Sequence, residues 1–311
     1  MAGDFVRHTE PFRRELLAHC YRMLGSVDEA EDLVQETYLR AWRSYSAFEG
    51  RSAVRTWLYR IATNVCLTAI ERRGRRPLPS DLAGPGEVDD GATVTWLQPV
   101  PDAMVSPVSD DPAEIVVTRA SLRLALVATM QYLPARQRAV LLLRDVLAWP
   151  AAEVAEVLDT TTAAVKSALQ RARARIDEVA PAADHLVEPT EPEARAQLHR
   201  YITAFEHADP AVLTEVLRTD AMLELPPSPT WYEGDGALRC AVGGLGSPGD
   251  WRMIPTAANG QPAAAAYHRD GDGTYRAYGI VVLTVTTIGI ARIVVFADPG
   301  LFATFGLPPT G

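Results

Sequence analysis

Residues 28–76 read DEAEDLVQETYLRAWRSYSAFEGRSAVRTWLYRIATNVCLTAIERRGRR, and the spacing of their apolar residues decides the fold of the first domain. Two amphipathic helices are predicted, joined by a short loop around Gly50, because apolar residues recur at helical intervals on both sides of it. Ser52 is the expected cap of the second helix. The predicted buried stripes are Ala30, Val34, Tyr38, Ala41 and Tyr45 in the first helix and Leu58, Ile61, Ala62, Val65 and Ala69 in the second.

Charge divides sharply along the same stretch. Residues 28–36 hold five acids and no base, whereas residues 40–76 hold nine arginines against two acids. The helix macrodipole favours acids early in a helix, but its effect fades within about one turn, so it does not explain an arginine excess over two helices. Arginines that hold phosphates, with aromatic rings that stack on unpaired bases, are typical of surfaces for single-stranded nucleic acid. The alternative is a solvated amphipathic helix pair.

The motif DEAEDLVQETYLRAW, followed by F-x-G-x-S-A-x-x-T-W-L-Y-R-I-A-x-N, resembles region 2 of the group 4 (extracytoplasmic-function) sigma factors. These are dissociable specificity subunits of bacterial RNA polymerase. The resemblance implies that core RNA polymerase is bound by Asp32, Gln35, Glu36 and Arg40. It also implies that the loop Phe48–Arg51 receives a flipped base of the −10 promoter element. The −10 DNA-binding residues implied in this way are Phe48, Arg51, Trp57, Tyr59, Arg60 and Asn64.

Length and composition set the limits for the whole chain. Its 311 residues predict about two to three domains, and a net charge of −9 argues against a simple nucleic-acid coat. Cys20, Cys66 and Cys240 are isolated, so we expect no metal site, no cofactor and no disulfide framework, and a reducing cytoplasm as the compartment. No apolar run approaches about 20 residues and the N-terminus lacks a signal-peptide core, so no association with a membrane is expected.

The first predicted domain, residues 1–77, is all-α, and a helix over 11–25 ending at Gly25 completes it. Residues 78–112 differ in kind, because they are rich in Pro, Gly and Asp and contain no Lys or Arg. This composition predicts a largely irregular acidic linker. Its apolar segment Trp96–Pro99 is expected to dock, either on the chain's own domains or on a partner.

Residues 113–178 return to helical periodicity, with one helix expected to carry Ile115, Leu122, Leu126 and Met130. A short helix, Ala151–Leu158, then precedes a turn and a longer helix, which is helix-turn-helix geometry. The outer face of the longer helix combines small and polar residues with cationic edges, which fits a major groove flanked by phosphates. An ordinary surface helix is the alternative. The segment resembles region 4 of the same sigma family, although Trp149-Pro150 replaces the expected small-residue turn. The residues expected to bind the −35 element are Lys166, Ser167, Gln170, Arg171 and Arg173.

A second linker, residues 179–192, leads to a domain of another character over residues 193–308. Helices are predicted over Ala194–His207 and Ala211–Arg218, a strand over Ala221–Leu225, and a hairpin from residues 278–286 and 290–297. This order predicts an α+β domain with a curved antiparallel sheet. Together with the segment PPSPTWYEG, it resembles the cone-shaped SnoaL-like (nuclear-transport-factor-2-like) domain, which is fused to several group 4 subfamilies, including the sigma-G-like one.

Polar and aromatic residues of this third domain raise the question of a pocket. A catalytic pair would need an acid and a base that converge in an apolar cavity, and the sequence places no carboxylate beside His268. We therefore expect no enzymatic activity, while a small-molecule ligand stays open. Candidate polar groups are Glu224, Tyr232, His268 and Asp298. Three aromatic residues have alternative roles, namely to line a ligand pocket, to pack the core or to face the sigma domains: Trp231, Tyr232 and Trp251.

Two readings of the whole chain compete. In the first, it is a sigma factor, monomeric when free, that binds core RNA polymerase and promoter DNA and is regulated in cis by its SnoaL-like domain. In the second, it is a helix-turn-helix regulator that carries a ligand-sensing or enzymatic SnoaL-like domain. Residues 28–64 favour the first, because a simple regulator has no need of an acidic helix face followed by an arginine-rich, aromatic helix.

Overall fold

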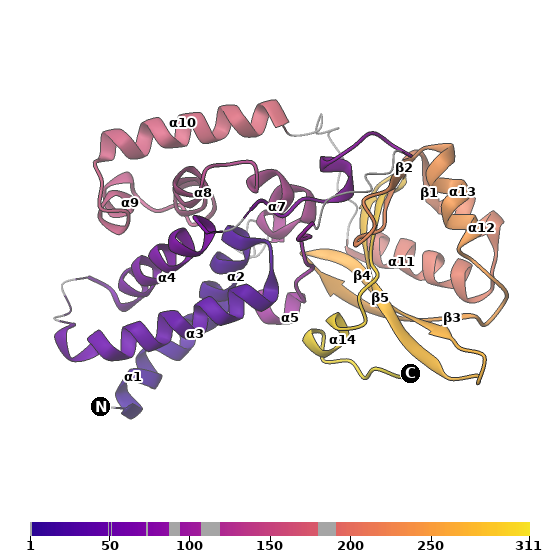
Figure 1. Cartoon of the computed structure of the whole chain (residues 1–311), viewed down its shortest axis with the longest axis horizontal. Helices are drawn as coiled ribbons and strands as arrows, with labels where there is room; N and C mark the ends of the chain where they lie inside the picture. Colours follow the sequence, from indigo (N-terminus) through magenta and orange to yellow (C-terminus); the bar gives the residue numbers. More distant parts are fainter. Residues whose placement is uncertain are drawn as a thin grey trace. The chain divides into compact units, whose positions relative to one another are not determined.

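A computed structural model of the chain describes residues 2–311 except 49, 51, 73, 87–93, 107–118 and 180–190. The chain forms two compact units (Figure 1). The first consists of Met1–Arg76 and Asp102–Pro181, and the second of Pro77–Pro101 and Ala182–Gly311. The segment expected to be a linker thus contributes residues 77–101 to the C-terminal unit.

The N-terminal part of the first unit is helical: α1 (Ala2–Thr9), η1 (Glu10–Phe12), α2 (Arg13–Leu24), α3 (Val27–Ser44), η2 (Tyr45–Ala47) and α4 (Val54–Ile70). Gly25 ends α2 in the left-handed conformation with φ 72°, which glycine adopts without steric cost. Ser26 caps α3, since its hydroxyl accepts a hydrogen bond from the N–H of Glu29 at 3.3 Å. The expected cap of α4 was wrong by one residue: Ala53 occupies that position and makes no side-chain cap.

The second part of this unit contains α7 (Leu124–Met130), α8 (Ala135–Leu141), the π-helical turn η4 (Leu142–Val146), α9 (Ala151–Val157) and α10 (Thr162–Val179). The short α5 (Asp102–Val105) precedes them and packs against α2. The helix expected to carry Leu122 and Met130 together is interrupted at Arg123, whose backbone is extended (ψ 137°), and Ile115 lies outside the described residues. A four-residue connection joins α9 to α10, as the helix-turn-helix prediction requires.

Arg138 on α8 ties the two helical parts together. Its guanidinium is buried and donates to the backbone carbonyl of Met23 at the end of α2. It also donates to the side-chain oxygen of Gln131 at 2.8 Å and to the carbonyls of Gln131 and Leu133 at 3.1 and 3.2 Å. Burial lowers the pKa of Arg138 to about 10, which still leaves it charged at neutral pH. One cation therefore satisfies several carbonyls that would otherwise lack donors.

The second unit is built on a six-stranded sheet of order β2-β1-β6-β5-β4-β3. Its strands are β1 (Leu217–Glu224), β2 (Trp231–Glu233), β3 (Trp251–Ala258), β4 (Gln261–Arg269), β5 (Tyr275–Thr286) and β6 (Gly289–Phe296). Its helices are α11 (Glu191–Glu206), α12 (Pro210–Val216), α13 (Asp235–Gly243), α14 (Leu301–Thr304) and the short η3 (Pro79–Asp81). The prediction of two helical domains followed by an α+β domain is confirmed. The purely antiparallel sheet was wrong, because β1 returns beside β6 in parallel.

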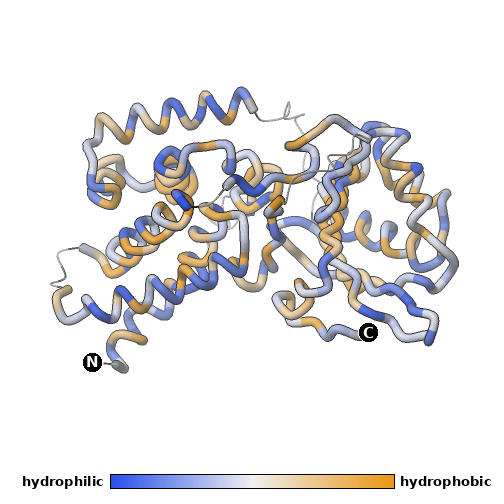
Figure 2. Tube along the Cα trace, viewed as in Figure 1, coloured by the Kyte–Doolittle hydropathy of each residue, from blue (hydrophilic) through white to orange (hydrophobic). Residues whose placement is uncertain are grey.

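Side chains on β1 and β6 alternate between two environments, as the pleat of a strand requires. Leu223 and Ile293 belong to the apolar core that α11, α12 and α13 complete. Glu224 and Arg292 point to the other face, where they contact Ser80. In Figure 2 orange, apolar stretches alternate with white and blue ones in the strands, and α10 likewise alternates between blue and orange along its length. No helix in the described ranges is both long and apolar enough to cross a membrane.

We predict that Arg138→Met destabilises the helical unit by about 3 kcal/mol or more, because buried carbonyls lose their donor and no water replaces it. Thermal unfolding followed by far-ultraviolet circular dichroism measures the effect. Arg136→Met on the exposed side of the same helix is the matched control, with an expected change within about 0.5 kcal/mol. Equal effects of the two variants would contradict the assigned role of Arg138.

Candidate functional site

The acidic face of α3 is open to solvent. Asp32 and Gln35 are exposed, and half-buried Glu36 accepts a hydrogen bond from Nε of Arg40 at 2.6 Å. Such a surface ion pair contributes only ~0–1 kcal/mol to the stability of the fold. Stabilisation of the helix is therefore a weak explanation for this group of polar side chains. The structure thus brings together on one helix the four residues that the resemblance assigns to polymerase binding, and that role stays a prediction.

Two apolar residues on the same helix were missed by the sequence reasoning. Leu39 and Trp42 are 52% and 44% exposed, although each is a large apolar side chain. They lie three residues apart, off the buried stripe, which places them near one another on the outer side of α3. Trp42 nevertheless packs edge-on against Phe5, with 5.2 Å between the ring centroids, so part of its ring is covered within the chain. The signal was present in the sequence, since neither residue fits the buried spacing.

Aromatic rings gather where the loop after α3 meets α4. The ring of Phe48 lies 4.7 Å from that of Trp57, with an angle of 31° between the planes, and Tyr45 lies 6.3 Å from Trp57. Arg60 and Asn64 are exposed further along α4 and share a face with Trp57 by helical spacing. A cation and an amide beside partly exposed rings suit an unpaired strand. Arg51 lies outside the described residues.

Tyr59, expected to bind the −10 element, does not face solvent. Its ring is fully buried and lies 5.1 Å from both His19 and Trp149. Its hydroxyl donates to the carboxylate of Glu15 at 3.2 Å, and burial, with Glu15 as a second cause, raises the pKa of Tyr59 above its usual range. The burial of Tyr59 speaks against that role, and it was not predicted because α4 packs on two sides, against α2 and against α9, whereas the periodicity of a single helix shows only one.

The long helix α10 presents its polar face to solvent. Val165, Leu169 and Ala172 are buried beneath it. Arg171 donates to the hydroxyl of Ser167 at 2.6 Å, which orients both side chains on the outer face. The residues expected to meet the −35 element, all exposed, are Lys166, Ser167, Gln170, Arg171 and Arg173.

Arg173 has a partner already. It forms a two-pronged ion pair with Asp145, with nitrogen–oxygen distances of 2.7 and 2.9 Å. Asp145 raises the pKa of Arg173, through the hydrogen bonds and then through its charge. A shallow hollow of about 370 Å³ runs along this edge of α10 and is lined by Lys166, Leu169, Gln170, Arg173, Ala174 and Asp177. A DNA phosphate would have to compete with Asp145 for the guanidinium of Arg173. Lys166 is a second cation on the same edge of α10.

The candidate residues of the C-terminal unit fall in different places. Trp231 is buried, and its indole N–H donates to the carbonyl of Ala83, in the linker, at 2.7 Å. Trp251 donates instead to the carbonyl of Gly244 at 2.9 Å and packs on Phe205, with 6.2 Å between the rings. Tyr232 is half-buried against the core. The three aromatic residues therefore serve linker contact and core packing.

The candidate acids and the histidine also have separate partners. Glu224 is fully buried and lies 3.1 Å from Nε of Arg292. His268 is exposed at the end of β4, with its ring 4.8 Å from Trp251. Asp298 is exposed and accepts a hydrogen bond from the N–H of Gly300 at 2.8 Å. Different elements thus hold them in different surroundings, which does not favour an acid–base pair.

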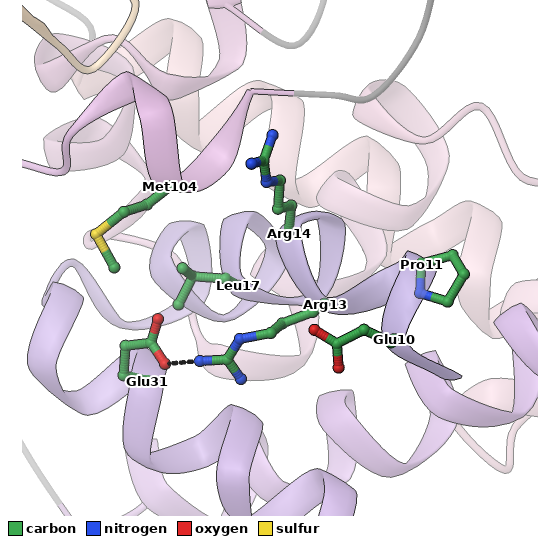
Figure 3. A pocket seen from close by; sticks show the side chains of 7 residues that line it. All are labelled: Glu10, Pro11, Arg13, Arg14, Leu17, Glu31 and Met104. Carbon is green, nitrogen blue, oxygen red and sulfur yellow. Dashed lines mark hydrogen bonds and ion pairs between the residues drawn. The ribbon is translucent and has the colours of Figure 1, made fainter. Parts of the chain in front are cut away.

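A further hollow, of about 290 Å³, lies in the helical unit and was not foreseen (Figure 3). Arg13 and Glu31 form an ion pair across it at 2.5 Å, and Met104 on α5 faces it. Its lining residues are Glu10, Pro11, Arg13, Arg14, Leu17, Glu31 and Met104. The ion pair joins α2 to α3 at this hollow. We therefore interpret the hollow as a gap left where these helices pack together.

Comparison with known proteins agrees with this geometry. Residues 9–76 match the Sigma-70 region 2 family, and residues 123–176 match the Sigma-70, region 4 family. The ECF RNA polymerase sigma factor SigW of Bacillus subtilis is 32% identical over 176 residues, which cover 54% of this chain and 84% of that protein. The crystal structure of Mycobacterium tuberculosis extracytoplasmic function sigma factor SigJ aligns with a TM-score of 0.63 at 25% identity, covering 98% of this chain and 99% of that one.

One relative spans almost the whole chain. The ECF RNA polymerase sigma factor SigG of Mycobacterium tuberculosis is 52% identical over 318 residues, which cover 98% of this chain and 84% of that protein. The two region matches lie on the helices that carry the exposed faces described above, and the C-terminal unit is included in the alignment. The chain belongs to the ECF RNA polymerase sigma factors.

Proposed function

We propose that this sigma factor binds core RNA polymerase through α3 and directs transcription from promoters that it reads with α4 and α10. The observation that carries the proposal is the exposure of polar side chains on α3, α4 and α10 while their apolar stripes are buried. On α10, Gln170 lies between cationic side chains, a pattern that suits a base edge flanked by phosphates. The −10 element is assigned to the surface made by Phe48, Trp57, Arg60 and Asn64.

The C-terminal unit is proposed to regulate the sigma domains in cis rather than to act as an enzyme. It resembles SnoaL-like domains, and its acids and histidine lie in separate surroundings. The supporting contact is with the linker: residues 77–101 pack with this unit, so a domain at the end of the chain holds the segment between the two promoter-reading parts. A small-molecule ligand of this unit and a monomeric free protein remain parts of the proposal.

Charge reversal at Asp32 and Glu36 to lysine should abolish binding to core polymerase and leave the melting temperature nearly unchanged. Both carboxylates lie off the core, and the ion pair of Glu36 with Arg40 is a surface pair. Binding is measured with labelled protein and core enzyme in the absence of DNA. Glu215→Lys with Glu233→Lys is the control, because it makes the same charge change at exposed positions of the C-terminal unit. Unfolding in place of lost binding would show that the acids are structural.

Gln170→Ala should change base preference at one or two positions of the −35 element, by about 1–3 kcal/mol at each base pair that Gln170 reads. Lys166→Ala should instead weaken binding to all sequences alike and reduce the slope of log affinity against log salt by roughly 0.9. Titrations of holoenzyme on a set of single-substitution promoters at several salt concentrations separate the two. An unchanged preference after Gln170→Ala would remove it as a reader.

A further inference from the structure

Two arginines on the outer face of α10 have partners of different charge. Arg171 donates to the neutral hydroxyl of Ser167 at 2.6 Å, a contact that leaves its positive charge in place. Arg173 donates from Nε to one carboxylate oxygen of Asp145 at 2.9 Å and from Nη2 to the other at 2.7 Å. The charge of Arg173 is therefore balanced before any DNA is bound, and the two arginines are not equivalent as DNA contacts.

The balanced pair of Arg173 and Asp145 is poorly suited to a DNA phosphate. A phosphate attracts a cation through its net charge, and the cation that neutralises it displaces counterions, which makes the contact depend on salt. The pair as a whole carries no net charge, and its carboxylate would repel a phosphate that approached the same guanidinium. A contact of Arg173 with the DNA backbone would thus have to break the ion pair first.

The donors that Arg173 keeps are suited to a base. A guanidinium has five N–H donors in a planar fork, and Asp145 takes the one on Nε and one on Nη2. Both hydrogens of Nη1 and the second hydrogen of Nη2 are left, along an edge that does not face the carboxylate. Two parallel donors of this kind match N7 and O6 of guanine, which arginine contacts in the major groove. These acceptors belong to a neutral base, so the direction of the hydrogen bonds matters more than the net charge.

The carboxylate of Asp145 is held by an element other than α10. Asp145 lies in the π-helical turn η4, where the N–H of Leu147 donates to the carbonyl of Leu142 at 3.0 Å. Leu142 is buried and anchors this turn in the core. A carboxylate fixed in this way sets the orientation of the guanidinium of Arg173 in advance, and a side chain that is already oriented loses less entropy when it binds.

Arg173 also lies where a reader of bases is needed. Lys166, Gln170 and Arg173 follow one another at intervals of four and three residues, which puts them on one stripe of α10. The side chain of Arg173 is 59% exposed. Three residues of helix rise about 4.5 Å, close to the roughly 3.4 Å between stacked base pairs. A helix that runs along the major groove therefore brings Gln170 and Arg173 to neighbouring base pairs.

We propose that Arg173 reads a guanine of the −35 element and that Asp145 is the positioning residue that orients its guanidinium for this contact. The inference rests on the proposed function of α10 and gives Arg173 a base in place of a phosphate. Asp145 contributes through Arg173 alone. The guanine is expected within two base pairs of the position that Gln170 reads.

The test uses the full chain bound to core RNA polymerase and a library of DNA duplexes randomised over the −35 region. Sequencing of the bound duplexes gives the base preference at each position. The unaltered chain should select a guanine next to the position that depends on Gln170. Arg173→Lys keeps the charge but removes the planar fork, so it should lower the preference for that guanine by about tenfold and leave the other positions unchanged.

Asp145→Asn tests the positioning role. It should lower the preference for the same guanine, and it should steepen the slope of log affinity against log salt by up to roughly 0.9, because the released Arg173 is then free to bind a phosphate. Asp177→Asn is the matched control, since it removes the same charge from the hollow that Arg173 lines and should keep the preference. In an Arg173→Lys chain, Asp145→Asn should change the preference no further.

The possible results separate this inference from the proposed function. Unchanged base preference after Arg173→Lys would overturn the reading of guanine, and full preference after Asp145→Asn would overturn the positioning role. A uniform loss of affinity for all sequences, with a lower melting temperature, would show that the ion pair only holds α10 to η4, which also overturns the inference. Absence of any −35 preference in the unaltered holoenzyme would instead contradict the proposed function.

Discussion

A carboxylate taken out of water must be paired, and at Glu224 the partners come from distant parts of the chain. Arg292 supplies the opposite charge from β6, and Ser80 supplies a backbone N–H from the linker. Removing one partner of such a buried pair costs about 3–5 kcal/mol, because the remaining charge is left without compensation. The course of the linker over the sheet is therefore tied to the parallel pairing of β1 with β6, which brings Glu224 and Arg292 together.

Hydrogen bonds to a buried polar group also hold the helical unit together. Arg138 satisfies the end of α2 and the chain after α7 at once, which joins the two promoter-reading parts through a single cation. Trp149 packs against Tyr59, and Arg55 lies over both rings at 5.7 and 5.4 Å while it pairs with Glu15 at 2.7 Å. The tryptophan that departs from the family turn before α9 is thus part of the contact between α9 and α4.

Much of the helical architecture was readable from the sequence, because most of these helices have one clear apolar stripe and recognisable residues at their ends. Gly25 ended α2, and the two helices after Pro150 appeared with their short turn. The acidic face of α3 and the polar face of α10 followed from the same periodicity, since a side chain off the stripe of a half-buried helix points to solvent. Leu39 and Trp42 obeyed that rule too, and their exposure could have been foreseen.

Only the tertiary structure decided the contacts that link residues far apart in sequence. Tyr59 lies off the stripe of α4 and is nevertheless buried, because a second helical part covers that side. The parallel pairing of β1 and β6 could not be read from strand patterns, which carry no direction. The linker's acidic, Pro- and Gly-rich composition predicted an irregular chain, and its backbone groups found partners on the sheet at Glu224, Trp231 and Asn259. Local sequence determines which side chains face inward on each element, whereas long-range packing determines which elements supply their partners.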